Sequence, residues 1–344
     1  MSRPLRVAVV GAGAFGRNHL RVYRELQASG EPVELVAVVD QDAAVVAAAA
    51  AQYGVPGFAS VEALLDANLR LDAASVCVPT VHHASTAAPL LAAHIDLLIE
   101  KPLAASLADA DAILALAREH QRIVQTGHLE RFNPAVTAVR GLLNRPMFFE
   151  SHRLSIFTPR SLDVDVVLDL MIHDLDIVLS LVDSPVREVR AVGLPVLSRK
   201  VDIANVRLEF ENGCVANFTA SRVSTERVRK LRFFQPHQYL SLDFARKDLL
   251  MIDVTAAAGM DPAMLAAIAE AATLKQSGHP SAGLSLRKVP VVDGEPLRLE
   301  IESFLHAVQT RTTPVVSGEA GRAALALALE INEAIAQHAA RTGL

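Results

Sequence analysis

The sequence Gly11-Ala12-Gly13-Ala14-Phe15-Gly16 follows one apolar run and precedes an amphipathic helical pattern. Gly11 permits a tight turn, Gly13 lets the backbone approach a ligand, and Gly16 lets the helix pack closely on the strand. Free amides and the dipole at the start of the helix favour a bound anion such as a pyrophosphate. In this context the stretch predicts a dinucleotide site, against the alternatives of an empty turn, another nucleotide or a flavin.

An acidic residue at the end of the second apolar run indicates which dinucleotide is bound. Asp40 lies 40 minus 16, or 24, residues after Gly16, close to the separation of about 20 at which an acid binds the ribose 2′-hydroxyl. A carboxylate there repels a 2′-phosphate, and the following Gln41 and Asp42 supply no cation. We therefore expect NAD as the cofactor in preference to NADP.

The first third of the chain alternates short apolar runs with amphipathic helical patterns, as repeated βαβ units do. Strands are expected at residues 5–11, 33–40, 73–78, 97–100 and 122–125. Helices are expected at residues 14–28, 41–53, 61–67, 83–94 and 107–120, the last with Ser106 as its cap. These elements predict an α/β protein with an N-terminal Rossmann domain, built on a doubly wound parallel sheet, over residues 1–126.

Longer alternating runs follow, and they predict a second, α+β domain on a mostly antiparallel open sheet over residues 127–344. Strands are expected at residues 147–155, 189–196, 204–211, 215–221 and 229–234. Asn212-Gly213 predicts a type I′ hairpin between two of them. Helices are expected at 164–181, 297–310 and 318–340, and the C-terminal one could pack back on the first domain. Residues 274–287 read as a loop that could order on ligand binding.

Composition limits the class of protein. The 344 residues include 33 Lys and Arg against 38 Asp and Glu, interspersed without a basic stripe, which argues against nucleic acid as a partner. We find no membrane-length apolar run and no signal peptide, and the two cysteines, Cys77 and Cys214, suit buried thiols in a reducing compartment. A cytoplasmic protein with a small-molecule substrate is expected.

Glu100-Lys101-Pro102 falls at the carboxyl end of a very apolar run. That end of a strand faces the ligand crevice in open α/β sheets. The alternative is an ordinary lysine that reaches solvent from a strand end.

A second group of ionisable residues lies in the predicted helix 164–181. Asp169 and His173 are four residues apart and Asp176 follows three later, so all three project from one face. Oxidation of a secondary alcohol needs a base for the hydroxyl proton and a positive group for the alkoxide, and His, Asp and Lys suffice. We expect no metal, because no His and Cys cluster with zinc spacing accompanies them.

The glycine stretch, Glu100-Lys101-Pro102 and the Asp169 to His173 helix together resemble the Gfo/Idh/MocA oxidoreductase family over nearly the whole chain. The resemblance implies a catalytic group of Lys101, Asp169 and His173, with Asp176 as a further site acid. It also implies a second domain whose open sheet builds homodimers or homotetramers. The cofactor-binding residues expected are Gly11, Gly13, Ala14, Phe15, Gly16, Asp40, Pro79, Glu100 and Lys101.

Two stretches are similar to the UDP-N-acetylglucosamine 3-dehydrogenases, which act with an aminotransferase in lipid A diamino-sugar synthesis. They are Gly127-His128-Leu129-Glu130-Arg131-Phe132-Asn133-Pro134 and Val166-Val167-Leu168-Asp169-Leu170-Met171-Ile172-His173-Asp174. A nucleotide-sugar pyrophosphate would need cationic partners. The substrate-binding residues expected are Arg131, Asn133, Arg153, Arg160 and Asp176, beside His152.

The resemblance implies NAD-dependent oxidation at C3 of UDP-N-acetylglucosamine, with His173 as the base, Lys101 stabilising the alkoxide and Asp169 orienting the pair. Three alternatives stay open. The substrate could be a free polyol or inositol, or a UDP-hexosaminuronate. The protein could instead be a regulator that binds NAD without turnover, or its cofactor could remain bound while it shuttles between two substrates.

Overall fold

The computed structural model describes residues 3–158, 164–253, 261, 263–264, 266–267 and 285–343. The chain divides into two compact units. Unit 1 comprises Met1–Phe132 and Gly294–Leu327, and unit 2 comprises Asn133–Asp293 and Ala328–Leu344. The ranges therefore differ from the expected 1–126 and 127–344, because Gly294–Leu327 packs with unit 1.

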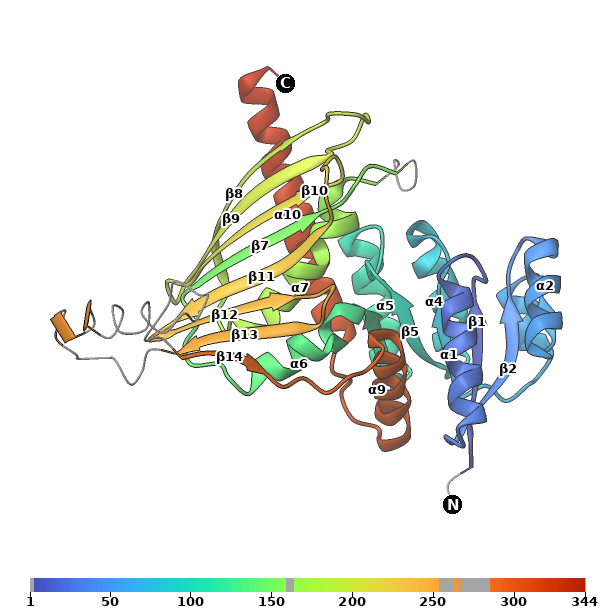
Figure 1. The fold of residues 1–344 in the computed structure, drawn as a ribbon. Helices are drawn as coiled ribbons and strands as arrows, with labels where there is room; N and C mark the ends of the chain where they lie inside the picture. The colour runs from blue at the N-terminus through green and yellow to red at the C-terminus, as the bar shows by residue number, and fades with distance from the viewer. Residues whose placement is uncertain are drawn as a thin grey trace. The chain divides into compact units, whose positions relative to one another are not determined.

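Unit 1 is built on a six-stranded sheet in the order β3-β2-β1-β4-β5-β6, in which every pair is parallel (Figure 1). The strands are β1 (Leu5–Val10), β2 (Val33–Val39), β3 (Gly57–Phe58), β4 (Ala73–Val76), β5 (Asp96–Glu100) and β6 (Val124–Gly127). This is the strand order of a Rossmann fold, so the expected doubly wound parallel sheet is confirmed. The short strand β3 was not anticipated.

Two groups of helices cover this sheet. α1 (Gly16–Ala28), α2 (Ala43–Tyr53) and α9 (Pro296–Thr310) pack on one core with β1 and β2. The second group comprises α3 (Val61–Asp66), α4 (His83–Ala92) and α5 (Leu107–Glu119). Ser106 caps α5 as expected, because its hydroxyl accepts a hydrogen bond from Asp109 N at 3.1 Å. Unit 1 also contains two 3₁₀ turns, η1 (Thr80–His82) and η2 (Leu129–Phe132).

Unit 2 is built on an eight-stranded sheet in the order β14-β13-β12-β11-β7-β10-β9-β8 (Figure 1). Its strands are β7 (Phe148–Leu154), β8 (Val186–Leu194), β9 (Ile203–Phe210), β10 (Val215–Ser221), β11 (Val228–Gln235), β12 (Gln238–Asp243), β13 (Asp248–Asp253) and β14 (Ser285–Val289). All neighbours are antiparallel except β7 and β10. The mostly antiparallel sheet is thus confirmed, although β12, β13 and β14 were missed.

One face of this sheet is buried and the other is open. Phe149 and Phe233 are fully buried and stack at 5.3 Å between ring centroids. Phe148 stacks on Phe234 at 5.5 Å, and Phe234 is 39% exposed. The helical elements of unit 2 include α6 (Pro134–Arg140), η3 (Val167–Met171), α7 (Ile172–Leu181) and the last part of α10 (Gly318–Thr342), whose first part belongs to unit 1.

Two local expectations are corrected. The helix predicted over residues 164–181 is not a continuous α-helix, because η3 is a π-helical turn in which Ile172 N donates to Val167 O. The Asn212-Gly213 hairpin is not type I′, which needs positive φ at both residues. Only Gly213 has it (φ +84°), and Gly213 N donates to Phe210 O. The turn is a three-residue loop with glycine at the left-handed position.

The loop expected at residues 274–287 lies outside the described residues up to 284, and residues 285–287 belong to β14. Within the described ranges, no helix has both the length and the apolar character needed to cross a membrane.

Candidate nucleotide and alcohol-oxidation site

The glycine turn is shaped by two close backbone approaches. Gly11 has φ +91°, and a Cβ there would lie 2.7 Å from the carbonyl carbon of Cys77. A Cβ on Gly16 would lie 1.7 Å from Gly11 O, so only glycine lets α1 begin so close to β1. A Cβ on Gly13 would meet nothing within 4 Å. The turn is therefore packed tightly at its first and third glycines and open at the second, where a ligand would approach.

The start of α1 offers backbone amides to an anion. Gly13, Ala14 and Phe15 are all exposed. Arg17 N donates to Gly13 O at 3.1 Å, which closes the first helical turn. The amides that precede it have no acceptor within a helix. They present donors and the positive end of the helix dipole, which suits a pyrophosphate.

Asp40 is tied to the glycine turn by its side chain. Its Oδ2 accepts a hydrogen bond from Ala12 N at 2.7 Å, and its Oδ1 accepts one from Asp42 N at 2.9 Å. Each carboxylate oxygen can accept a further bond. The carboxylate is therefore held at the carboxyl end of β2 and can still receive a ribose hydroxyl.

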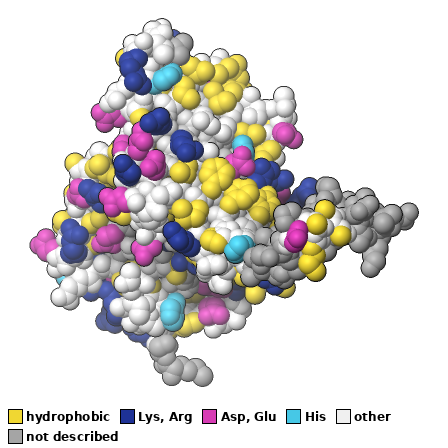
Figure 2. Space-filling view, turned by 90° about the vertical axis from the view of Figure 1, so that its left-hand side faces the viewer, with side chains coloured by type: hydrophobic (Ala, Val, Ile, Leu, Met, Phe, Trp, Pro, Cys, Tyr) yellow, Lys and Arg dark blue, Asp and Glu magenta, His cyan; other side chains and the backbone are white. Residues whose placement is uncertain are grey.

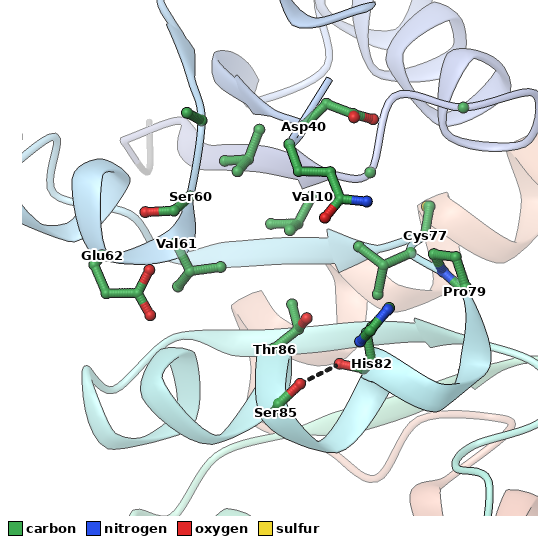
Figure 3. A pocket seen from close by; sticks show the side chains of 16 residues that line it. Val10, Asp40, Ser60, Val61, Glu62, Cys77, Pro79, His82, Ser85 and Thr86 are labelled. Carbon is green, nitrogen blue, oxygen red and sulfur yellow. Dashed lines mark hydrogen bonds between the residues drawn. The ribbon is translucent and has the colours of Figure 1, made fainter. Parts of the chain in front are cut away.

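A cavity of about 340 Å³ opens beside this turn, at the carboxyl ends of the first four strands (Figure 3). Its lining comprises Val10, Gly11, Gly13, Val39, Asp40, Gln41, Ala59, Ser60, Val61, Glu62, Cys77, Val78, Pro79, His82, Ser85 and Thr86. The open cradle at Gly13 and the polar groups around it fit a dinucleotide. Among the described residues of this lining, no lysine or arginine is present.

Four of the expected cofactor-binding residues line this cavity, namely Gly11, Gly13, Asp40 and Pro79. The lining does not include the remaining ones, Ala14, Phe15, Gly16, Glu100 and Lys101. Sequence reasoning missed Ser60, Glu62, His82, Ser85 and Thr86. They follow β3 and β4, and the rule that ligands bind at the carboxyl ends of parallel strands could have indicated them.

Glu100 and Lys101 lie at the carboxyl end of β5 in unit 1. Lys101 is half-buried and joined to Pro102 by a cis peptide bond. The Glu100 side chain is buried against His19, whose Nε2 lies 2.9 Å from Glu100 Oε1. Sequence reasoning missed His19, although a histidine one turn after Gly16 on the buried face of α1 was a possible signal.

His83, the first residue of α4, contacts the segment that follows Lys101. Its Nδ1 is 3.0 Å from Pro102 O, and its Nε2 is 3.0 Å from Val78 O. Burial lowers the pKa of His83, against hydrogen bonds to these carbonyls that raise it. The ring therefore links the segment after Lys101 to the cavity wall at Val78.

The second predicted group of ionisable residues, Asp169, His173 and Asp176, lies in unit 2. Asp169 is in the π turn η3 and His173 is in α7, and both are half-buried. Asp176 is buried, with 2% exposure. π turns inside helices are frequent at functional sites. Asp165 caps this helix, because its Oδ1 accepts hydrogen bonds from Val167 N and Leu168 N at 2.9 and 3.0 Å.

Arg153 has a buried partner. Its Nε and a terminal guanidinium nitrogen donate to the two carboxylate oxygens of Asp174 at 2.9 and 2.7 Å. Its guanidinium also lies over the Phe244 ring, 5.3 Å from the centroid. The bidentate geometry fixes the side chain between β7 and α7.

The other expected substrate residues have varied surroundings. Arg131 is buried in unit 1 and donates to Val315 O at 3.1 Å. Asn133 caps α6 by accepting from Ala135 N, and its amide donates to Phe244 O at 3.2 Å. His152 is half-buried on the open face of β7. Arg160 lies outside the described residues.

Two family models match the chain. One, described as oxidoreductase family, NAD-binding Rossmann fold, matches residues 5–128, and the other, the GFO/IDH/MocA C-terminal domain, matches residues 132–235. The chain belongs to the Gfo/Idh/MocA oxidoreductase family. The family resemblance inferred from the sequence is thereby confirmed, and unit 1 carries the NAD-binding Rossmann fold of this family.

Individual relatives agree with this assignment. The UDP-N-acetylglucosamine 3-dehydrogenase of Acidithiobacillus ferrooxidans is 35% identical over 332 residues, which are 96% of this chain and 97% of that protein. A solved structure of the enzyme of that name and organism superposes with a TM-score of 0.83 at 33% identity, covering 97% of this chain and 98% of the other. The inositol 2-dehydrogenase of Leifsonia xyli subsp. xyli is 34% identical over 193 residues, 54% of this chain and 56% of that enzyme.

Each unit of this Gfo/Idh/MocA oxidoreductase carries ionisable groups of the kinds that alcohol oxidation uses. Unit 1 has the nucleotide cavity and, at the end of β5, the half-buried Lys101, and unit 2 has the half-buried His173 and Asp169 on one helical segment. An imidazole can accept the hydroxyl proton, and an ammonium can stabilise the oxygen that loses it.

Proposed function

We propose that this oxidoreductase is a sugar dehydrogenase that oxidises the C3 hydroxyl of UDP-N-acetylglucosamine to the 3-keto sugar with NAD. One observation carries this proposal. The likeness to the Acidithiobacillus ferrooxidans 3-dehydrogenase extends over 96% of this chain and 97% of that protein, at 35% identity. Both units, and not the dinucleotide fold alone, share that likeness.

The roles proposed for the chain's residues follow from their chemistry. The His173 imidazole takes the proton of the C3 hydroxyl, and the Lys101 ammonium stabilises the developing alkoxide. Asp169, on the same helical segment as His173, orients the imidazole. A bound nicotinamide supplies the hydride acceptor. The hydroxyl thus loses a proton and its carbon a hydride, which balances as a ketone, NADH and one proton released to solvent.

NAD is proposed in preference to NADP because of the cavity's charge. Asp40 and Glu62 lie in its lining. Two carboxylates disfavour a 2′-phosphate, which would carry further negative charge, whereas the ribose 2′-hydroxyl of NAD can donate to Asp40.

Oxidation of a free polyol is the second candidate. It is favoured by the 34% identity to the Leifsonia xyli inositol 2-dehydrogenase, which covers 54% of this chain. We place it second because the match covers only about half of each chain. A UDP-hexosaminuronate remains a further alternative, as do a regulator that binds NAD without turnover and an enzyme that retains its nicotinamide between substrates.

A panel of substrates tests the proposal. NADH formation from NAD is measured with UDP-N-acetylglucosamine, UDP-N-acetylglucosaminuronate, myo-inositol and glucose, with a carbonyl trap to pull the oxidation forward. We expect signal with UDP-N-acetylglucosamine alone. NADH formed with inositol or the uronate, and none with UDP-N-acetylglucosamine, would rule out UDP-N-acetylglucosamine as the substrate. The protein would then still be an NAD-dependent dehydrogenase of a hydroxyl group. NAD binding without turnover of any sugar would favour the regulator.

The proposed setting of the reaction is the cytoplasm, where a partner aminotransferase would consume the keto sugar.

Homodimers or homotetramers are proposed from the open sheet face. Figure 2 shows apolar side chains gathered among charged ones on one side of the molecule. In unit 2, Phe148, Phe234 and Tyr239 form an aromatic group on the less buried face of the sheet. Such a face suits a second copy of the chain.

A further inference from the structure

Unit 1 contains a row of buried, hydrogen-bonded polar side chains that ends at Glu100, next to Lys101. His19 is fully buried on α1, with its Nε2 2.9 Å from Glu100 Oε1 and its Nδ1 3.1 Å from Ser75 Oγ. The Tyr23 hydroxyl lies 2.9 Å from the same Ser75 Oγ. These hydrogen bonds thus link α1, the helix that follows the glycine turn, to Glu100, the residue that precedes Lys101.

From Tyr23 through Ser75 and His19 to Glu100, each group of this row can donate its hydrogen bond to the next. Burial raises the pKa of Tyr23, so its hydroxyl stays protonated and donates to Ser75. In this arrangement Ser75 Oγ donates to His19 Nδ1, and the ring N–H at Nε2 donates to Glu100 Oε1. Every group uses its donor, as buried polar groups require. The arrangement orients Glu100 through charge-assisted hydrogen bonding.

Glu100 is also fixed from the opposite side. Gly127 on β6 pairs with Glu100 on β5, and a Cβ on Gly127 would lie 2.8 Å from Glu100 Oε1. The carboxylate therefore occupies the space above a glycine, with His19 as its hydrogen-bond donor. Lys101 is the next residue along the chain, so the position of Glu100 sets where the lysine leaves the strand.

We propose that His19 is a positioning residue for the oxidation, because it locks Glu100 and hence Lys101 in register with the glycine turn at the start of α1. This inference rests on the function proposed above. In the proposed reaction the glycine turn would bind the pyrophosphate and the Lys101 ammonium would stabilise the reacting oxygen. The His19–Glu100 hydrogen bond joins α1 to β5, so it would fix the position of Lys101 relative to the bound cofactor. Small displacements of such groups are costly in rate.

A bound metal ion is the competing explanation. The ligand atoms of His19, Cys77 and Glu100 all lie within 4.8 Å of one another. Zinc ligands at about 2.0 Å from a tetrahedral ion stand about 3.3 Å apart, whereas His19 Nε2 and Glu100 Oε1 are at hydrogen-bond distance, 2.9 Å. Burial, with the charges of Glu100 and Glu300, raises the pKa of the Cys77 thiol. A protonated thiol is a poor ligand, so the direct bond is favoured.

The first test uses His19→Leu, which removes the donor, and His19→Gln, whose amide can still donate to Glu100. Asp96→Asn is the matched control, since Asp96 is buried at the other end of the same strand and pairs with Arg311. We expect His19→Leu to lower kcat on UDP-N-acetylglucosamine by roughly 10²-fold, with KM and the Kd for NADH nearly unchanged. The deuterium isotope effect at C3 should rise, and His19→Gln should recover part of the rate.

A second readout needs no sugar substrate. The rate at which an amine-reactive reagent acylates Lys101 is measured by peptide mass spectrometry with NADH bound, and Lys288 serves as the internal reference. We expect His19→Leu to change the Lys101 rate well beyond any change in Asp96→Asn. This measurement decides the role of His19 even if wild-type protein fails to oxidise UDP-N-acetylglucosamine, which would count against the proposed function alone.

Two results would overturn the proposal. One is a His19→Leu enzyme whose isotope effect and Lys101 acylation match those of Asp96→Asn, which would make His19 an ordinary core residue. The other is stoichiometric zinc in the purified protein that is lost in His19→Leu, which would make the group a metal site.

Discussion

Lys101 is the residue on which the proposed chemistry depends most. An alkoxide forms as the proton leaves, and an ammonium beside it lowers the barrier more than it strengthens ground-state binding. Lys101 immediately follows Glu100, the buried last residue of β5, so the backbone from which its side chain extends is held in place.

Replacing Lys101 with Met removes this charge and keeps the length of the stem. We expect kcat to fall by roughly 10²–10⁴-fold. NADH affinity, measured by nicotinamide fluorescence, should stay near the wild-type value because Lys101 is not in the lining of the nucleotide cavity. Lys288→Met in unit 2 is the control. An active Lys101→Met enzyme would refute the role given to this lysine.

His83 makes the stability of the protein depend on pH. The unfolded chain binds a proton at the ordinary histidine pKa of about 6.5, whereas burial lowers the pKa of His83 in the folded protein. At pH values between the pKa of His83 in the folded protein and its pKa in the unfolded chain, the unfolded state binds more protons. The free energy of unfolding therefore rises with pH in this range and decreases as the pH falls below about 6.5.

We therefore expect His83→Gln to weaken the loss of stability between pH 7.5 and 5.5, measured by urea unfolding at each pH. The exposed His306 provides the control, since His306→Gln should leave the loss unchanged. An identical pH dependence in wild type and His83→Gln would show that this group does not contribute.

At the scale of elements, the contact between β7 and α7 holds the predicted catalytic helix. Arg153 and Asp174 form a bidentate pair with side-chain exposures of 5% and 2%. Removing one member of such a pair leaves a buried charge without its counter-ion.

Arg153→Met should lower the free energy of unfolding by about 3–5 kcal/mol. Arg232→Met on the neighbouring β11 is the matched control, because its pair with Glu150 is more than a third exposed, and its loss should cost at most about 1 kcal/mol. Denaturant unfolding at neutral pH measures both. Equal losses in the two variants would contradict the role assigned to the buried pair.

The elements that could be predicted are those whose signals are local. Ser106 caps α5, and periodicity located the helices of unit 1, since a cap and a repeating apolar face need no distant partner. β12 and β13 were missed because their turns carry unusual residues. His237 and Lys247 adopt positive φ there, at 63° and 53°, where glycine or asparagine is the usual signal.

Parts of the site depended on pairings that no single segment encodes. The parallel pairing of β7 with β10 joins strands separated by two others in the chain. Two contacts depend on the packing of other elements in the same way, namely the pair of Arg153 on β7 with Asp174 on α7 and the contact of His19 on α1 with Glu100 on β5, 81 residues apart. Charges and motifs identified candidate residues, whereas burial decided which charges are paired inside the protein.

At the scale of the whole molecule, the chain combines an NAD-binding Rossmann unit with the C-terminal domain of its family. In the function proposed above, the first unit binds NAD and the second unit selects the hydroxyl that is oxidised. The position of oxidation on the sugar therefore distinguishes the proposed 3-dehydrogenase from other sugar dehydrogenases.

The most direct test gives the enzyme NAD and UDP-N-acetylglucosamine that carries deuterium only at C3, and measures the mass of the reduced nicotinamide formed. If C3 is the reacting carbon, the NADH carries the deuterium and the sugar product is a 3-ketone. NADH of ordinary mass, formed while the sugar is consumed, would show that another carbon reacts and that the enzyme is not a 3-dehydrogenase.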